Sequence, residues 1–176
     1  LHRERRTGGA DHFLDFIEQT LIPEVAARIP LDREKLGLWG HSFGGLLTLY
    51  AGQTRPGLFR CTIAASPSLW WRNGAFAQRL SATTTPLPAA LLLTRGTAET
   101  PPPPPADAAP ISVERWRARA GQPEEAFRQL ATQLQARPNA RVSTLEFPGL
   151  SHGQAFDASI NPALEWFSRC ADRPDQ

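Results

Sequence analysis

Apolar residues along this chain form two alternating patterns: short continuous runs, and longer stretches with helical spacing. Runs of strand length occupy residues 35–39, 60–66, 87–94 and 141–147. Stretches of helical periodicity occupy residues 11–29, 46–53, 73–80, 111–135 and 160–170. Strands that alternate with helices pair in parallel and build layered α/β folds. The pattern therefore predicts a parallel sheet of four strands with flanking helices.

Prolines interrupt this pattern at three places. Pro23 predicts a kink in the first helix, because proline cannot donate a backbone hydrogen bond. Residues 121–123, Gly-Gln-Pro, predict a break within the helical stretch 111–135. Five consecutive prolines exclude helix and central strand, and we interpret residues 101–110 as a solvated proline-rich loop or insertion.

The segment from Leu36 to Gly45 passes from an apolar strand, through Gly40-His41-Ser42-Phe43-Gly44, into an apolar helix. A serine on such a sharp turn adopts a strained backbone conformation, and we expect the flanking glycines to remove side chains that would clash. The pattern is that of a nucleophile elbow, which holds the hydroxyl at the carboxyl edge of the sheet. The amino end of the following helix favours negative charge there. The predicted chemistry is acyl transfer through an ester of Ser42.

A serine nucleophile requires a base, which is most often histidine. The chain has four histidines, His2, His12, His41 and His152. Two precede the elbow, and we expect the ring of His41 to point away from the Ser42 hydroxyl. His152 follows the last strand, in a predicted loop at residues 148–153, from which it can reach back over the sheet edge. We therefore predict that His152 is the catalytic base.

The carboxylate that would orient the base has three candidates. Glu99 is preferred, because it lies in the loop after the third strand, the usual position of the acid. Asp107 lies beyond the prolines, and Asp157 follows His152 and so breaks the order serine, acid, histidine. A Ser42–His152 dyad also stays open, since a carbonyl or water can orient an imidazole.

Further site residues are expected at the same edge. The backbone amide of Phe43 is the predicted oxyanion donor, and the second donor normally comes from a loop after an earlier strand, which these residues do not include. Trp70, Trp71 and Arg72 follow the second strand. They form either a substrate wall for an aromatic or anionic acyl group, or core packing under a lid-like helix.

Composition narrows the function classes. A hydrophobic content of 41% and a charged content of 20% are typical of a globular protein. A net charge of +2 does not indicate a surface that binds nucleic acid. The sequence has no apolar run long enough to cross a membrane, and no spaced metal ligands or phosphate-binding glycine loop, so no cofactor is predicted. We interpret Cys61 and Cys170 as buried or inert thiols, in preference to a redox or metal-binding role.

The sequence begins at Leu1 and contains no methionine, so we expect a processed product or a fragment. The compartment, cytoplasmic or periplasmic, is therefore left open.

Four motifs carry a family resemblance: Gly8-Gly9-Ala10-Asp11-x-Phe13-Leu14-x-Phe16-Ile17, Gly40-His41-Ser42-Phe43-Gly44-Gly45, Ser66-Pro67-Ser68-Leu69-Trp70-Trp71 and Phe147-Pro148-Gly149-x-x-His152-Gly153. With them the chain resembles the bacterial putative-esterase family of α/β-hydrolases, above all the siderophore esterases that open enterobactin- and salmochelin-type trilactones. The resemblance implies an α/β-hydrolase fold, Ser42 as nucleophile and His152 as base. It also implies a small-molecule ester substrate, such as a ferric or free catecholate siderophore. Some of these esterases are thought to use a dyad, which keeps the role of Glu99 open.

The chain departs from that family in one respect: the family has several strands before the elbow, and the sequence shows none. We therefore expect residues 1–176 to be the carboxy-terminal part of one domain, with the elbow strand as an unpaired apolar edge. Three functions follow from the sequence. They are a siderophore esterase, a general carboxylesterase or thioesterase of the same fold, and a non-catalytic remnant or binding module.

Overall fold

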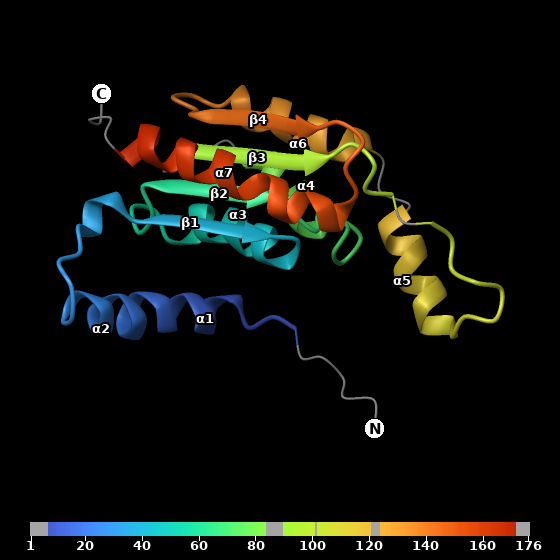
Figure 1. Cartoon of the computed structure of the whole chain (residues 1–176), viewed down its shortest axis with the longest axis horizontal. Coiled ribbons are helices and arrows are strands. Elements are labelled where there is room, and N and C mark those ends of the chain that lie inside the picture. The colour runs from blue at the N-terminus through green and yellow to red at the C-terminus, as the bar shows by residue number, and fades with distance from the viewer. Residues whose placement is uncertain (1–6, 84–89, 101, 121–123, 172–176) are drawn as a thin grey trace.

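A computed structural model of the chain describes residues 7–83, 90–100, 102–120 and 124–171 (Figure 1). The elements, in chain order, are α1 (Ala10–Phe16), the π-helical η1 (Ile17–Leu21), α2 (Ile22–Ala26), the 3₁₀-helical η2 (Arg33–Lys35), β1 (Gly37–His41), α3 (Phe43–Thr54), β2 (Cys61–Ala65), α4 (Ala75–Ala82), β3 (Ala90–Gly96), α5 (Pro110–Ala120), α6 (Glu124–Gln135), β4 (Val142–Phe147) and α7 (His152–Ala171). The break predicted at residues 121–123, and the start of the third strand at 87–89, lie outside the described residues.

The four strands form one parallel sheet, as the sequence pattern predicts, and the structure gives their order as β1-β2-β3-β4. All four arrowheads in Figure 1 point the same way, so the carboxyl ends of the strands meet at one edge. Every residue of β2 and β3 is buried, which explains why these strands read as continuous apolar runs. The residues predicted to be catalytic all follow strand ends at this edge: Ser42 after β1, Glu99 after β3, and His152 after β4.

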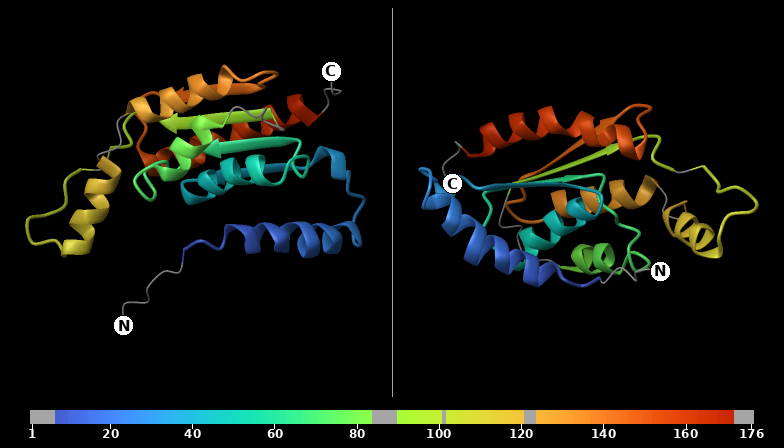
Figure 2. Two further views of the ribbon diagram at one scale, coloured as in Figure 1. Left: turned by 180° about the vertical axis from the view of Figure 1, so that it is seen from behind. Right: turned by 60° about the horizontal axis from the view of Figure 1, so that its bottom comes forward.

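Helices cover both faces of the sheet (Figure 2). On one face, α7 packs across β1, β2 and β3. On the other, α3, α4 and α6 bury an apolar core against the sheet that includes Leu49, Leu93 and Leu134. The chain therefore forms three layers, helix, sheet and helix, which is the α/β-hydrolase arrangement in partial form.

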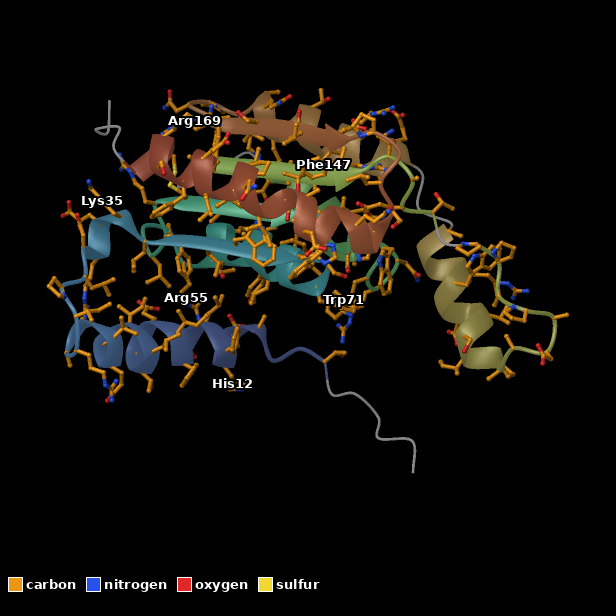
Figure 3. All side chains as sticks on the ribbon, viewed as in Figure 1. His12, Lys35, Arg55, Trp71, Phe147 and Arg169 are labelled. Carbon is orange, nitrogen blue, oxygen red and sulfur yellow. A yellow bond between two sulfur atoms is a disulfide. The ribbon has the colours of Figure 1, made fainter. Side chains whose placement is uncertain are left out.

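In Figure 1 the first predicted helix runs in one direction from α1 to α2, while its hydrogen bonding changes before Pro23. A π-helical turn at Ile17–Leu21 separates α1 from α2, and Pro23 lies in the first turn of α2. This segment packs on α3 through Leu14 and Ile17. Arg55, at the end of α3, pairs with Asp15 at 2.8 Å and lies between the two helices in Figure 3.

Cys61 and Cys170 are buried, but they form a disulfide, with Cα atoms 6.2 Å apart, so our interpretation of two free thiols was wrong. Cys61 begins β2 and Cys170 lies in the last turn of α7. Their meeting depends on α7 crossing the sheet, because 109 positions separate them in sequence. By restricting the unfolded chain, a bridge over so long a loop stabilises the fold by about 2–4 kcal/mol.

Two features at the periphery of the molecule agree with predictions from the sequence. Residues 102–105 of the proline run form neither helix nor strand, and the loop leads into α5, which projects from the body of the molecule (Figure 1). Strand β1 is the edge strand of the sheet on the side where the sequence predicts an unpaired edge. No helix in the described part of the chain is long and apolar enough to span a bilayer.

Candidate active site

Ser42 lies on the tight turn between β1 and α3, in a conformation that few residues adopt. Its backbone has φ 59° and ψ −116°, outside the regions favoured by L-amino acids. Two hydrogen bonds hold it: the Ser42 N–H donates to the Ala65 carbonyl at 2.9 Å, and the Leu46 N–H donates to the Ser42 carbonyl at 3.0 Å. The strained turn predicted from the glycine pattern is therefore present, supported by both β2 and α3.

Of the two glycines that flank Ser42, Gly40 relieves a clash as the sequence predicts, and Gly44 does not. A Cβ on Gly40 would lie 2.3 Å from the Gly44 carbonyl oxygen, so a side chain is excluded there. A Cβ on Gly44 would meet nothing within 4 Å, and the expectation that Gly44 relieves a clash is wrong. The crowded position is Gly45, whose Cβ would lie 2.8 Å from the Ala65 carbonyl oxygen. The first helical turn crosses β2 closely at that residue, which local sequence spacing does not reveal.

His152 is the first residue of α7 rather than part of a loop, which corrects the prediction of a loop over residues 148–153. Ser151 caps the helix: its hydroxyl and its N–H both donate to the Gln154 side chain, at 2.9 and 3.0 Å. A serine followed three positions later by glutamine is the signature of a capping box, and it was available in the sequence. The imidazole is thus attached to a capped helix end.

The structure brings together Ser42, His152 and Glu99. The Ser42 Oγ lies 3.0 Å from His152 Nε2, and His152 Nδ1 lies 2.9 Å from Glu99 Oε2. These distances are within hydrogen-bond range, and they form a continuous chain from carboxylate through imidazole to hydroxyl. The other two candidate acids, Asp107 and Asp157, are exposed.

Glu99 is held by three donors. Besides His152, the Ser66 hydroxyl and the Gly96 N–H each donate to Oε1 at 2.6 Å. Burial alone would raise the pKa of Glu99, but the hydrogen bonds from His152, Ser66 and Gly96 outweigh burial and lower this pKa below its usual range. The carboxylate beside the imidazole is therefore ionised at neutral pH.

The loops after β3 and β4 are bonded to each other, which fixes Glu99 relative to His152. The Ala98 N–H donates to the Leu150 carbonyl at 3.0 Å, and the Gly149 N–H donates to the Thr97 hydroxyl at 2.8 Å. A Cβ on Gly96 would lie 2.1 Å from the Leu150 carbonyl oxygen, so the approach requires glycine.

The imidazole of His41 packs against the ring of His152 and contacts the His152 backbone. Its Nε2 donates to the His152 carbonyl at 3.0 Å, and the two ring centroids are 4.5 Å apart. Burial lowers the pKa of His41, and the nearby ring of His152 lowers it further. A neutral His41 therefore anchors the start of α7, a role that sequence reasoning did not find.

The remaining predicted site residues lie near the same edge. Phe43 begins α3, and its N–H has no partner within the helix, as expected for a first-turn residue. Its side chain meets Trp70 edge to face at 5.4 Å. Arg72 stacks over Trp71 at 4.8 Å, and Trp71 lies toward the end of the molecule where the strands stop (Figure 3). Trp70 and Trp71 are half-buried and Arg72 is exposed.

Two buried hydroxyls at the site were not predicted. Ser68 Oγ lies 3.1 Å from Ser42 Oγ, and Ser66 Oγ contacts Glu99 as described above. Both belong to the Ser-Pro-Ser segment that follows β2, at the edge of the sheet where the strands end. This position after a strand was the signal in the sequence from which the two hydroxyls could have been predicted. Among the described residues, no group of three or more His, Cys, Asp and Glu side chains is arranged to hold a metal ion.

Several known proteins similar to this chain are named as esterases of siderophores. The siderophore triacetylfusarinine C esterase of Aspergillus fumigatus is 58% identical over 69 residues, which are 38% of this chain and 23% of that protein. The apo-salmochelin esterase of Escherichia coli is 29% identical over 165 residues, 91% of this chain and 46% of that protein.

Solved structures agree with the fold. The siderophore hydrolase EstB from Aspergillus nidulans superposes with a TM-score of 0.69 at 34% identity, covering 96% of this chain and 60% of that one. The enterobactin and salmochelin hydrolase IroE gives 0.64 at 26% identity, covering 96% and 59%. The chain thus spans about 60% of these solved chains and less than half of the two curated relatives.

The family described as "Putative esterase" matches residues 2–100, which include the elbow, the Ser-Pro-Ser segment and Glu99. The chain belongs to this esterase family and has the α/β-hydrolase fold in partial form.

Proposed function

We propose that this chain carries the active site of a serine esterase that cleaves carboxylic ester bonds of siderophores. In this proposal Ser42 is the nucleophile, His152 is the general base and Glu99 orients the base. The observation that supports it best is the hydrogen-bonded chain Glu99–His152–Ser42, with heavy-atom distances of 2.9 and 3.0 Å.

The first half of the reaction would form an acyl-enzyme. The Ser42 Oγ attacks the ester carbonyl carbon while its proton moves to His152 Nε2, 3.0 Å away. The imidazolium then gives this proton to the leaving alcohol oxygen as the carbon–oxygen bond breaks. Ionised Glu99 stabilises the imidazolium and keeps its Nδ1–H directed at the carboxylate.

The second half reverses these roles, with water as the nucleophile. His152 takes a proton from water, the hydroxide attacks the acyl carbon, and Ser42 leaves with the returned proton. The tetrahedral oxyanion carries its charge above the amino end of α3, where the Phe43 N–H is the proposed donor.

The proposed substrate is a siderophore ester. Support comes from the relatives, which are named as esterases of triacetylfusarinine C and of salmochelin, and from EstB and IroE. Trp70, Trp71 and Arg72 are the proposed substrate contacts. Aromatic faces and a guanidinium at this edge suit stacking with an aromatic or anionic acyl group.

Ser42→Ala tests the nucleophile. The variant should lose hydrolysis of both p-nitrophenyl acetate and a siderophore trilactone, and it should no longer gain mass from a fluorophosphonate that reacts with activated serines. Ser168→Ala, an exposed serine far along α7, serves as the control and should keep both activities. Undiminished turnover by a folded Ser42→Ala variant would contradict the mechanism.

Substrate comparison separates this proposal from a general carboxylesterase or thioesterase of the same fold. A siderophore esterase should show a kcat/KM for enterobactin or triacetylfusarinine C far above that for simple acetyl esters and thioesters. Equal values would favour the general enzyme.

A non-catalytic binding module is the other candidate, favoured by the unpaired edge of the sheet at β1, beside which the described residues place no further strand. In that case the folded chain would bind the siderophore, as measured by tryptophan fluorescence, but would neither hydrolyse it nor react with the fluorophosphonate.

A further inference from the structure

Two buried serines contact opposite ends of the hydrogen-bonded chain at the active edge. Ser66 and Ser68 are 3% and 1% exposed, and they lie just beyond β2. The Ser66 hydroxyl donates to Glu99 Oε1 at 2.6 Å, and Ser68 Oγ lies 3.1 Å from Ser42 Oγ. One short segment therefore contacts both the carboxylate and the nucleophile.

The backbone holds this segment rigidly. Ser66 has a φ of 44°, in the left-handed region, and its N–H donates to the Thr94 carbonyl at 2.7 Å. The Ser68 N–H donates to the Ser42 carbonyl at 3.1 Å, and Pro67 between them has a fixed φ. The two hydroxyls are thus anchored to the loop after β1 and to β3.

The direction of each hydrogen bond follows from the chemistry of the groups. An ionised Glu99 only accepts, so His152 Nδ1 carries a proton, and a ring that acts as the base must accept at Nε2. The Ser42 O–H therefore donates to Nε2. The lone pairs of Ser42 Oγ are then available to the Ser68 O–H, 3.1 Å away.

We propose that Ser68 is a catalytic residue that donates a hydrogen bond to the reacting oxygen of Ser42, and that Ser66 is a positioning residue that acts through Glu99. The proposal rests on the proposed role of Ser42 as nucleophile. As the Ser42 proton moves to His152, the oxygen gains negative charge and the bond from Ser68 strengthens. Ser68 keeps its own proton throughout.

Ser66 acts on the carboxylate rather than on the nucleophile. It donates to Glu99 Oε1, while His152 bonds Oε2, so the two contacts fix the rotation of the carboxyl group. The Ser66 hydroxyl also favours the charged form of Glu99 and helps to lower its pKa, against the effect of burial.

The test of Ser68 uses the full chain with two substitutions at this residue and one matched control elsewhere. Ser68→Ala should lower kcat about tenfold at unchanged KM, the effect of one lost hydrogen bond to charge, and should slow fluorophosphonate labelling by the same factor. Ser68→Cys fills the space but donates weakly, so it should remain slow. Restoration of the rate by cysteine would overturn the proposal, because it would mean that Ser68 only fills space.

The matched control is Ser159→Ala. Ser159 is also fully buried and also loses hydrogen bonds on substitution, since its Oγ donates to the Phe156 carbonyl at 2.8 Å and accepts from Trp39 Nε1 at 3.3 Å. It contacts neither Ser42 nor Glu99. The Ser159→Ala variant should keep the wild-type kcat and labelling rate. This holds even if the substitution lowers the free energy of unfolding as much as Ser68→Ala does.

Ser66 is tested by a double-mutant cycle with Glu99. Ser66→Ala should lower kcat several-fold in the wild-type background and have no effect in Glu99→Gln, whereas Ser68→Ala should keep its cost in both. The downfield proton resonance of His152 Nδ1 should shift in Ser66→Ala and stay in place in Ser68→Ala and Ser159→Ala. Equal costs of Ser66→Ala in both backgrounds would refute its action through Glu99.

The outcomes distinguish a failure of the roles proposed for Ser66 and Ser68 from a failure of the proposed esterase function. If Ser42→Ala is inactive while Ser66→Ala and Ser68→Ala match the wild type, the esterase mechanism stands and this inference fails. If Ser42→Ala retains turnover and labelling, the proposed function itself has failed.

Discussion

Contacts of a few single residues hold one of the three candidate carboxylates beside the base. The Glu99 carboxylate contacts His152, Ser66 and the Gly96 N–H, whereas Asp107 and Asp157 are exposed. A partly buried carboxylate with three donors is kept ionised, which is the state that an imidazole base requires.

Glu99→Gln tests whether the carboxylate is needed for catalysis. The amide can donate as well as accept, so it no longer enforces the tautomer with the proton on His152 Nδ1. We expect kcat to fall by at least about a hundredfold, with little change in KM. Glu165→Gln, on the exposed surface of α7, is the control and should be fully active. A Glu99→Gln variant with wild-type kcat would instead favour a Ser42–His152 dyad.

The same substitution has a predicted effect on stability. Because the native pKa of Glu99 is lowered from 4.5, the unfolded chain takes up this proton first as the pH falls. The stabilisation from Glu99 is therefore complete above pH 4.5 and is lost as the pH falls through the native pKa. Urea denaturation at a series of pH values should show a shallower acid loss of unfolding free energy for Glu99→Gln than for Glu165→Gln. Identical slopes would contradict it.

The start of α7 connects the fold to the base. His152 is its first residue, Ser151 and Gln154 cap it, and the Ala155 N–H donates to the Ser151 carbonyl at 2.9 Å. His41 bonds the His152 carbonyl from β1. The orientation of the imidazole thus depends on the capping of a helix whose other end is joined to β2 by the Cys61–Cys170 disulfide.

Ser151→Ala tests this dependence. Loss of the cap should lower the unfolding free energy by about 1 kcal/mol and also lower kcat, because the first turn that carries His152 would fray. Ser168→Ala removes a comparable hydroxyl from the same helix, one that donates to the Leu164 carbonyl at 3.1 Å, and should leave kcat unchanged. The measurements are urea denaturation and steady-state kinetics. Equal kinetic effects of both variants would argue against a special role for the cap.

At the scale of the whole molecule, the sheet has two edge strands, β1 and β4, and the β1 edge lies beside an exposed apolar surface of α7. An apolar groove of about 370 Å³ lies there, lined by Gly37, Trp39, Ile63, Phe156, Ile160, Ala163, Leu164 and Phe167. Leu164 is 61% exposed. An unpaired strand beside exposed apolar side chains is a site for further strands to pair. We propose that residues 1–176 are the carboxy-terminal part of a larger domain that pairs at this edge.

The isolated chain should therefore self-associate through this side. Sedimentation velocity should detect dimers or larger species that increase with concentration, and Leu164→Lys should shift the distribution toward monomer. The control Ile111→Lys introduces the same charge on the projecting α5, where Ile111 is 44% exposed. This variant should not change the distribution of species. A chain that stays monomeric at high concentration would count against an open pairing edge.

Much of the fold was predictable because the signals are local. Continuous apolar runs predicted β2 and β3, which are buried on both faces, and helical spacing predicted α3 and α6. The helical start of α7 was missed although its capping signal, Ser151 to Gln154, is in the sequence. The disulfide could not be predicted, because the pairing of Cys61 with Cys170 depends on how α7 crosses the sheet.

By itself, the sequence determined the strained turn at Ser42, the parallel pairing of the strands and the position of His152 after the last one, since sterics and periodicity act between near neighbours. Only the tertiary structure decided that Glu99 lies beside the imidazole, that Gly45 rather than Gly44 meets β2, and that Ser66 and Ser68 reach the two ends of the hydrogen-bonded chain. These contacts join loops from different strands, and their distances depend on sheet register and helix packing, which no local pattern records.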